Sequence, residues 1–135
     1  MSTNDLTIAM VGSGGDGVVT MGDLIATVAT REGLHVIKTE GYGPQIRGGE
    51  SSCTVRVAAR EIFAQGDAVD VLLVFRWADF ARFRGEIEVA PNAVILYEST
   101  DPTPAEEVEL PVDDRELWIP VPFDRLSRDA TGAAG

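Results

Sequence analysis

Apolar runs and amphipathic segments alternate along about the first hundred residues of the chain. Residues 6–11 (LTIAMV) are an apolar run that ends at a cluster of glycines, which is typical of a buried parallel strand entering a tight turn. In residues 18–32 the apolar positions have the spacing of one helix face: Met21, Leu24, Ile25 and Val28. Gly33 follows, where a left-handed residue commonly ends a helix. The pattern predicts a strand, a glycine turn and a helix.

A β-hairpin is predicted in the middle of the chain. Residues 35–39 (HVIKT) read as a second short strand, and residues 40–49 are too rich in glycine to continue it. Apolar and polar side chains alternate over residues 53–57, and after an AARE turn a short apolar run returns at Ile62 and Phe63. This alternation predicts a hairpin with one solvated face.

Strand and helix patterns return further along the chain. Residues 69–75 (VDVLLVF) and 93–97 (AVILY) read as buried strands, with a short helix at residues 77–84 between them. The aromatic residues of that helix are expected in the core: Trp77, Phe80 and Phe83. Together the elements predict a Rossmann-like, three-layer α/β fold with a mixed, mainly parallel sheet and an inserted β-hairpin.

The pattern changes beyond residue 98. Residues 101–114 are rich in proline and acidic side chains and are expected to form a solvated loop. Residues 117–123 (LWIPVPF) fit an edge strand interrupted by prolines, and residues 129–135 read as a small, polar tail.

Composition narrows the possible partners. The chain of 135 residues has 11 Lys and Arg against 22 Asp and Glu, a formal net charge of -11, which argues against nucleic acid or an anionic lipid surface. Its one cysteine, Cys53, allows no internal disulfide and no cysteine-ligated cluster. No apolar run approaches the roughly 18 residues of a membrane span. We therefore expect a cytoplasmic protein with no nucleic-acid or membrane partner.

The first glycine motif fits a dinucleotide-binding turn by pattern. Residues 12–17 (GSGGDG) satisfy G-x-G-x-x-G between a strand and a helix, and an acidic residue ends the next strand. The residues used would be Gly12, Gly14, Gly17 and Glu40. Asp16 opposes this interpretation, because two unit charges 4 Å apart cost about 4 kcal/mol at an effective dielectric near 20.

Two other interpretations of this motif stay open. Gly14, Gly15 and Gly17 would merely permit a tight turn, with Asp16 as the N-cap of the following helix. Alternatively, the turn and its exposed amides would contact a partner, or a ligand held by another subunit.

A second glycine-rich loop, residues 41–51 (GYGPQIRGGES), is too specific for a generic connection. Pro44 fixes its own φ, while Tyr42 and Arg47 offer an aromatic face and a planar five-donor fork. Loops of this kind usually carry function, although Arg47 taken alone also fits a surface salt bridge. His35, the one histidine, is expected to be structural, and no catalytic nucleophile is identified.

These motifs together resemble the gamma subunit or gamma domain of the 2-oxoacid:ferredoxin (or flavodoxin) oxidoreductases. That family has a G-x-G-G-x-G-V turn, here within residues 11–18, and a Y-G-P-x-x-R-G-G loop, here residues 42–49. A similarly patterned strand, residues 51–57, and a G-D-x-x-D-x-L segment, residues 66–72, follow in the same order. The resemblance covers most of residues 6–97.

The resemblance implies a role inside a larger enzyme. Members of the family decarboxylate a 2-oxoacid on thiamine diphosphate, pass electrons through iron–sulfur clusters to ferredoxin, and release an acyl-CoA. Thiamine diphosphate, Mg2+, [4Fe-4S] clusters and CoA are implied for the assembled enzyme and none for this chain alone. The implied partners are the pyrimidine-binding alpha subunit, the thiamine diphosphate-binding beta subunit and ferredoxin. The chain would organise the complex and border the route of substrate and CoA.

The expected ligand or interface residues lie in the two loops, and no catalytic or metal-binding residue is assigned. They are Gly14, Gly15, Asp16, Gly17, Tyr42, Gly43, Pro44, Arg47, Gly48, Gly49 and Ser51. Because the family's gamma domain continues with a helix-rich stretch, residues 1–135 are expected to be one domain that is incomplete at its C-terminus. A stand-alone dinucleotide-binding domain and a pure protein-interaction scaffold remain the alternatives.

Overall fold

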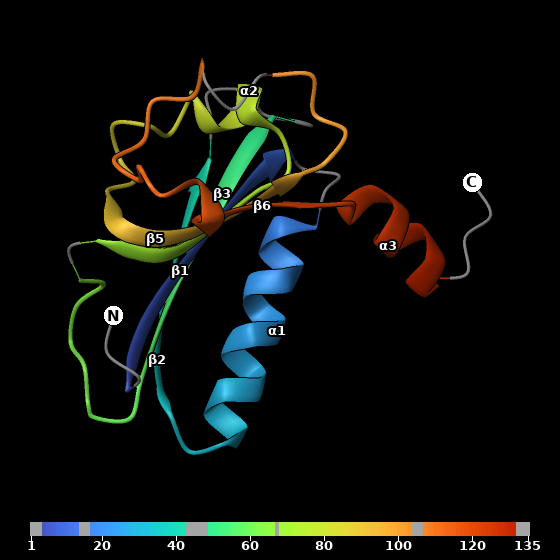
Figure 1. Ribbon diagram of the computed structural model, residues 1–135. Helices are drawn as coiled ribbons and strands as arrows, with labels where there is room; N and C mark the ends of the chain where they lie inside the picture. Colours follow the sequence, from blue (N-terminus) through green and yellow to red (C-terminus); the bar gives the residue numbers. More distant parts are fainter. Residues whose placement is uncertain (1–3, 14–16, 43–48, 67, 104–106, 132–135) are drawn as a thin grey trace.

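The computed structural model describes residues 4–13, 17–42, 49–66, 68–103 and 107–131. Within these ranges six strands form one sheet in the order β2-β3-β1-β4-β5-β6 (Figure 1). The strands are β1 (Asp5–Ser13), β2 (His35–Tyr42), β3 (Glu50–Ala58), β4 (Val69–Val74), β5 (Val89–Glu98) and β6 (Trp118–Val121). The helical elements are α1 (Val18–Arg31), α2 (Trp77–Phe80), the 3-10 turn η3 (Arg115–Leu117) and α3 (Phe123–Thr131).

The sheet has a parallel half and an antiparallel half. β1, β4, β5 and β6 run parallel to one another, whereas β3 is antiparallel to both β1 and β2. The chain leaves β1 through α1, forms β2 one strand away, and returns as β3 in the space between them. The predicted α/β fold with a mixed, mainly parallel sheet is therefore confirmed.

The prediction that residues 62–63 form the second strand of a hairpin with β3 is wrong. Residues 62–63 form no strand, and Phe63 is 84% exposed. Both edges of β3 are already occupied, by β1 and by β2, so a returning strand has no free edge to pair with. The antiparallel unit of the fold is instead β2–β3.

Helix α1 lies across one face of β1, β2 and β3 (Figure 1). It approaches the sheet closely at Gly22, which lies over the buried thiol of Cys53. Only part of the predicted apolar face of α1 is buried against the sheet, because Leu24 is 61% and Val28 51% exposed. The residues of α1 that the structure buries are Val18, Gly22 and Ala29.

The two ends of α1 are set by glycines. At the C-terminal end Gly33 has φ 83° and its N–H donates to the Thr30 carbonyl, which confirms the predicted left-handed stop. At the N-terminal end the N-cap is Gly17, with φ 77°, and not Asp16 as one interpretation of the motif expected. Asp16 itself lies outside the described residues.

The opposite face of the sheet carries a larger apolar cluster. Trp77, Phe80 and Phe83 are all buried in it, so their predicted core role is confirmed. The Trp77 and Trp118 rings lie with their centroids 6.0 Å apart, and the Trp118 indole N–H donates to the Val112 carbonyl. This cluster attaches the proline-rich segment to the sheet, since Val112 is 2% exposed.

The C-terminal part of the chain is more regular than its composition suggested. β6 forms the predicted edge strand, parallel to β5. Helix α3 follows and projects past the end of β6, away from the sheet, where the sequence predicted a polar tail from residue 129 (Figure 1). Within the described ranges the helices are too short or too polar to span a lipid bilayer.

Glu98, the last residue of β5, anchors the start of α3. Its carboxylate is buried and accepts hydrogen bonds from the backbone N–H groups of Asp124 (2.9 Å) and Thr100 (3.0 Å), and from the Thr100 hydroxyl (2.9 Å). Burial alone would raise the pKa of Glu98, but these hydrogen bonds outweigh it and hold the pKa below its ordinary value.

We expect Glu98→Gln to destabilise the protein by about 1 to 3 kcal/mol, because the new amide would place a buried donor against other donors. Hydrogen–deuterium exchange of the variant should be faster than in the unaltered protein at the amides of α3, and unchanged at those of β1. Since folding lowers the pKa of Glu98, its contribution is present at neutral pH and is lost as the pH falls through the folded-state pKa. The exposed Glu116→Gln serves as control, and equal effects of both variants would contradict this role.

Candidate functional site

The two glycine loops leave the sheet at the same edge. Gly12 of β1 pairs with Ser51 of β3, and Ser51 in turn pairs with Tyr42 of β2. The turn after β1 and the loop between β2 and β3 therefore start side by side, at the carboxyl ends of β1 and β2. In open α/β sheets this edge is where ligands bind, next to the point where the strand order reverses.

Only part of the predicted site falls within the described residues. Gly17, Tyr42, Gly49 and Ser51 are described, and they lie at this edge. The other predicted site residues lie outside the described ranges: Gly14, Gly15, Asp16, Gly43, Pro44, Arg47 and Gly48.

The N-terminus of α1 opens onto this edge without a side-chain cap. Gly17 is exposed and left-handed, and its carbonyl accepts the first helical hydrogen bond from the Met21 N–H at 2.9 Å. The N-cap residue itself makes no side-chain cap hydrogen bond, and the first turn contains no acidic residue. Such an end attracts anions, because free N–H groups and the helix dipole both favour negative charge.

Tyr42, the last residue of β2, lies at the same edge of the sheet and is 64% exposed. Its hydroxyl donates to Glu40 Oε2 at 2.7 Å, while Lys38 Nζ donates to Glu40 Oε1 at 2.7 Å. Lys38 also pairs with Asp23 of α1. The hydrogen bond to the Glu40 carboxylate raises the pKa of Tyr42, and the bonds from Lys38 and Tyr42 lower the pKa of Glu40.

This arrangement argues against the dinucleotide interpretation. Glu40, which would bind the ribose, already has both carboxylate oxygens engaged by Lys38 and Tyr42. Moreover, β3 separates β2 from β1, so at about 4.8 Å per strand Glu40 lies roughly twice as far from the glycine turn as adjacent strands would place it.

We expect Glu40→Gln to lower the pKa of Tyr42 toward that of an ordinary tyrosine, because the charged acceptor that holds the phenol proton is gone. An ultraviolet absorbance titration of the two tyrosines, Tyr42 and Tyr97, measures this directly. Tyr42→Phe assigns the transition. An unchanged titration curve in Glu40→Gln would show that the hydrogen bond does not form in solution.

Polar contacts that the sequence did not reveal fix the edge in place. The Ser13 hydroxyl donates to Asp79 Oδ2 at 2.7 Å, which ties the end of β1 to α2. The Trp77 N–H donates to Asp101 Oδ2 at 2.9 Å and so ties α2 to the segment after β5. Ser51 is buried on β3, where it pairs with Gly12 of β1 and Tyr42 of β2. No local pattern signals these contacts, because each joins distant parts of the chain.

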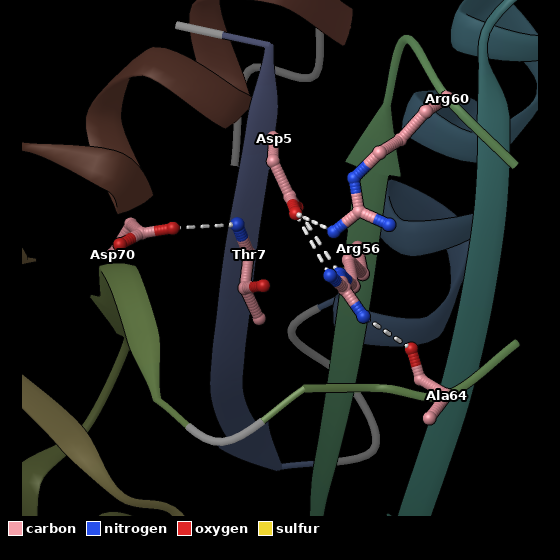
Figure 2. A network of polar contacts seen from close by, with 6 residues as sticks. All are labelled: Asp5, Thr7, Arg56, Arg60, Ala64 and Asp70. Carbon is pink, nitrogen blue, oxygen red and sulfur yellow. Dashed lines mark hydrogen bonds and ion pairs between the residues drawn. The ribbon is translucent and has the colours of Figure 1, made fainter. Parts of the chain in front are cut away.

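The G-D-x-x-D-x-L segment is structural in its described residues. Gly66 has φ 94° and lies against the Arg56 guanidinium, so the site requires a residue that adopts positive φ. Asp70 Oδ2 accepts from the Thr7 N–H at 3.0 Å, at the start of the parallel pairing of β1 with β4 (Figure 2). This motif therefore positions β4 beside β1.

The described residues do not fit an iron–sulfur cluster or a metal ion. Cys53 is buried beneath Gly22, and burial raises the pKa of its thiol, which disfavours the thiolate that a cluster needs. Among the described residues no group of three or more His, Cys, Asp or Glu is arranged to hold a metal.

The fold is that of a Rossmann-like α/β domain, with the N-terminus of α1 at the carboxyl end of the first parallel strand. Residues 7–135 match the pyruvate ferredoxin/flavodoxin oxidoreductase family, and the chain belongs to that family. It is 35% identical over 97 residues to ketoisovalerate oxidoreductase subunit VorA of Methanothermobacter thermautotrophicus, covering 71% of this chain and 20% of that protein.

Two further comparisons agree. 2-Oxoglutarate synthase subunit KorC of Archaeoglobus fulgidus is 31% identical over 97 residues, covering 71% of this chain and 51% of that protein. The 2-oxoglutarate:ferredoxin oxidoreductase of Magnetococcus marinus, solved with 2-oxoglutarate, coenzyme A and succinyl-CoA bound, superposes with a TM-score of 0.78 at 25% identity. That match covers 96% of this chain and 22% of the other chain. The chain thus spans between a fifth and about half the length of these relatives.

Proposed function

We propose that this chain is the gamma component of a 2-oxoacid:ferredoxin oxidoreductase, which converts a 2-oxoacid and CoA to an acyl-CoA and CO2 while reducing ferredoxin. In this role the chain is not catalytic by itself. It organises the complex and borders the route of substrate and CoA with its two glycine loops. Its family membership and its similarity to subunits of such enzymes support the proposal.

The cofactors follow from this assignment. Thiamine diphosphate, Mg2+ and the [4Fe-4S] clusters belong to alpha and beta subunits or domains and to the electron-transfer part of the complex, with ferredoxin as acceptor. The buried Cys53 supports the assignment of the iron–sulfur clusters to other subunits or domains, because this chain offers no exposed thiolate among its described residues. We place the assembled enzyme in the cytoplasm.

The observation that supports the ligand-facing role is the N-terminus of α1, which has no side-chain cap from its N-cap Gly17 and lies at the edge of the sheet where exposed Tyr42 ends β2. Free N–H groups at such an end suit a carboxylate or a phosphate. CoA carries phosphates and a 2-oxoacid carries a carboxylate, so both substrates of the proposed reaction offer the charge that this edge favours. Arg47, five residues after Tyr42 in the sequence, would add a charge-assisted, two-point contact.

The test is Arg47→Ala in the assembled enzyme. We expect KM for CoA or for the 2-oxoacid to rise about tenfold with assembly intact, since one charge-assisted hydrogen bond contributes about 1.5 to 3 kcal/mol. Arg31→Ala, in the last turn of α1 at the other end of the helix, is the matched control. Unchanged KM values for both substrates in Arg47→Ala would remove Arg47 from the ligand route.

A further inference from the structure

A cleft with a mixed polar and apolar lining lies on the face of the sheet opposite α1. Helix α1 packs on the side of Cys53 and Val55, so strand alternation places Ser52 and Thr54 on the other side. There the cleft has a volume of about 210 Å³. Its floor is formed by β1, β2 and β3, and its walls by the segments before β4 and before β5. The lining includes Thr7, Thr39, Gly41, Ser52, Thr54, Gln65, Glu86 and Glu88.

The floor is made of hydroxyl groups where a sheet face normally carries apolar side chains. Thr7 and Ser52 are buried and Thr54 is half-buried, on neighbouring strands. The structure gives these three hydroxyls no hydrogen bond within its described residues. None of these three oxygens is among the fully buried unpaired atoms, so they open onto the cleft, where they can both donate to and accept from an occupant.

Gly41 provides the room for this floor. A Cβ at residue 41 would lie 2.6 Å from Ser52 Oγ and 3.4 Å from the Phe83 ring. Any larger residue at this position would therefore push Ser52 out of place and narrow the cleft. The glycine that precedes Tyr42 thus has a role on the far side of the sheet from α1.

Gln65, in the wall, carries a buried donor. Its Oε1 accepts from the Thr39 hydroxyl at 2.8 Å, but its buried Nε2 has no acceptor among the described residues. The terminal torsion of a glutamine side chain is broad, so a small rotation presents this donor to an occupant of the cleft. The cleft therefore offers one donor without an acceptor, Gln65 Nε2. It also offers hydroxyl groups, which act both as hydrogen-bond donors and as acceptors.

The charges at the rim exclude anions. Glu86 and Glu88 carry exposed carboxylates there, and no Lys or Arg lines the described part of the cleft. Carboxylates accept hydrogen bonds and need donors from the occupant. An organic ammonium would supply donors only and would leave Gln65 Nε2 unpaired. A group with several hydroxyls supplies both donors and acceptors.

We propose that this cleft binds a neutral polyhydroxyl group of the size of one sugar ring. Its volume is below the 300 to 1,000 Å³ of typical small-molecule pockets, which suits a single ring and not a whole nucleotide. The hydroxyls of Thr7, Ser52 and Thr54 bond to one edge of the ring, and Glu86 and Glu88 accept from hydroxyls at the mouth. Ala68 and Ile87 pack against its C–H groups.

The test is a nitrogen–proton NMR titration of the full chain with D-ribose, and with tetrahydrofurfuryl alcohol as a ring that lacks most of the hydroxyls. We expect saturable shifts at the amides of Ser52, Thr54 and Gln65 with D-ribose, and a clearly weaker response to the alcohol. Thr54→Val removes one hydroxyl at constant shape and should weaken D-ribose binding about three- to tenfold. Thr30→Val, whose hydroxyl bonds to Ala26 on α1, should leave it unchanged.

Glu86→Gln is the second variant, because it changes an exposed side chain and leaves the sheet untouched; it should also weaken D-ribose binding. The proposal is overturned if D-ribose causes no saturable shifts at the cleft, or if Thr54→Val and Glu86→Gln both bind it as the unaltered chain does. Tighter binding of n-butylammonium than of D-ribose would overturn it as well, since the cleft would then select a cation.

Discussion

Replacing Gly22 by alanine is expected to destabilise the protein by about 1 to 3 kcal/mol, even though alanine is normally the better helix former by about 1 kcal/mol. The reason is the contact between α1 and β3. A Cβ on Gly22 would overlap Cys53 Sγ and lie 3.3 Å from Cys53 Cβ, so the helix would have to move off the sheet. Thermal and urea unfolding of the variant measure the loss.

Two further variants separate this contact from a general effect of losing a glycine. Gly85→Ala adds a methyl group where nothing lies within 4 Å, and should be nearly neutral. Cys53→Ala removes the overlapping sulfur, so Gly22→Ala should cost much less in the Cys53→Ala background. Equal effects of Gly22→Ala and Gly85→Ala would contradict the packing described for α1.

Replacing Arg56 by methionine is expected to destabilise the protein by about 2 to 3 kcal/mol. Figure 2 shows its guanidinium facing Asp5, with Nε and Nη2 donating to the two carboxylate oxygens at 3.0 and 2.7 Å, while Nη1 donates to the Ala64 carbonyl at 2.7 Å. Arg56 is largely buried, so its loss leaves a partly buried carboxylate and carbonyl without their donor. Hydrogen exchange at Gln65 and Gly66 should accelerate.

The pH dependence gives this prediction a second readout. The hydrogen bonds from Arg56 lower the pKa of Asp5, so the contribution of the pair is present above the ordinary carboxyl pKa and is lost as the pH falls through the folded-state value. Arg56→Met should therefore lose less stability on acidification than the unaltered protein. The exposed Arg60→Met is the control, with an expected loss of at most about 0.5 kcal/mol. A similar loss in both variants would contradict the role given to Arg56.

Local patterns predicted the elements whose causes are local. The run before the first glycines became β1, the helical spacing became α1, and the left-handed stop at Gly33 lies where expected. Residues 62–63 failed to form a strand because both edges of β3 are occupied, a fact of sheet order that no window of sequence contains. Helix α3 was missed because its first turn is held by Glu98, which lies 26 residues before Asp124.

The candidate site was predictable as a pair of motifs but not as a geometry. The spacing of the glycine turn and the Tyr42 loop pointed to one family, and the pairing of Gly12, Ser51 and Tyr42 now places both at one edge. The acidic residue of the dinucleotide pattern was misleading, because the inserted strand β3 moves Glu40 away from the turn. The hydroxyl floor of the cleft gave no signal, since Ser and Thr in a strand fit a solvated face equally well.

The most direct test of the proposed function is to purify the chain, with a tag, from the cells that produce it and assay what comes with it. The account predicts a multi-subunit complex that reduces ferredoxin only when CoA and a 2-oxoacid are both present, with pyruvate, 2-oxoglutarate and 2-ketoisovalerate tested side by side. A chain that purifies without partner subunits and binds NADH would contradict the account, as would a complex with no CoA-dependent 2-oxoacid oxidation.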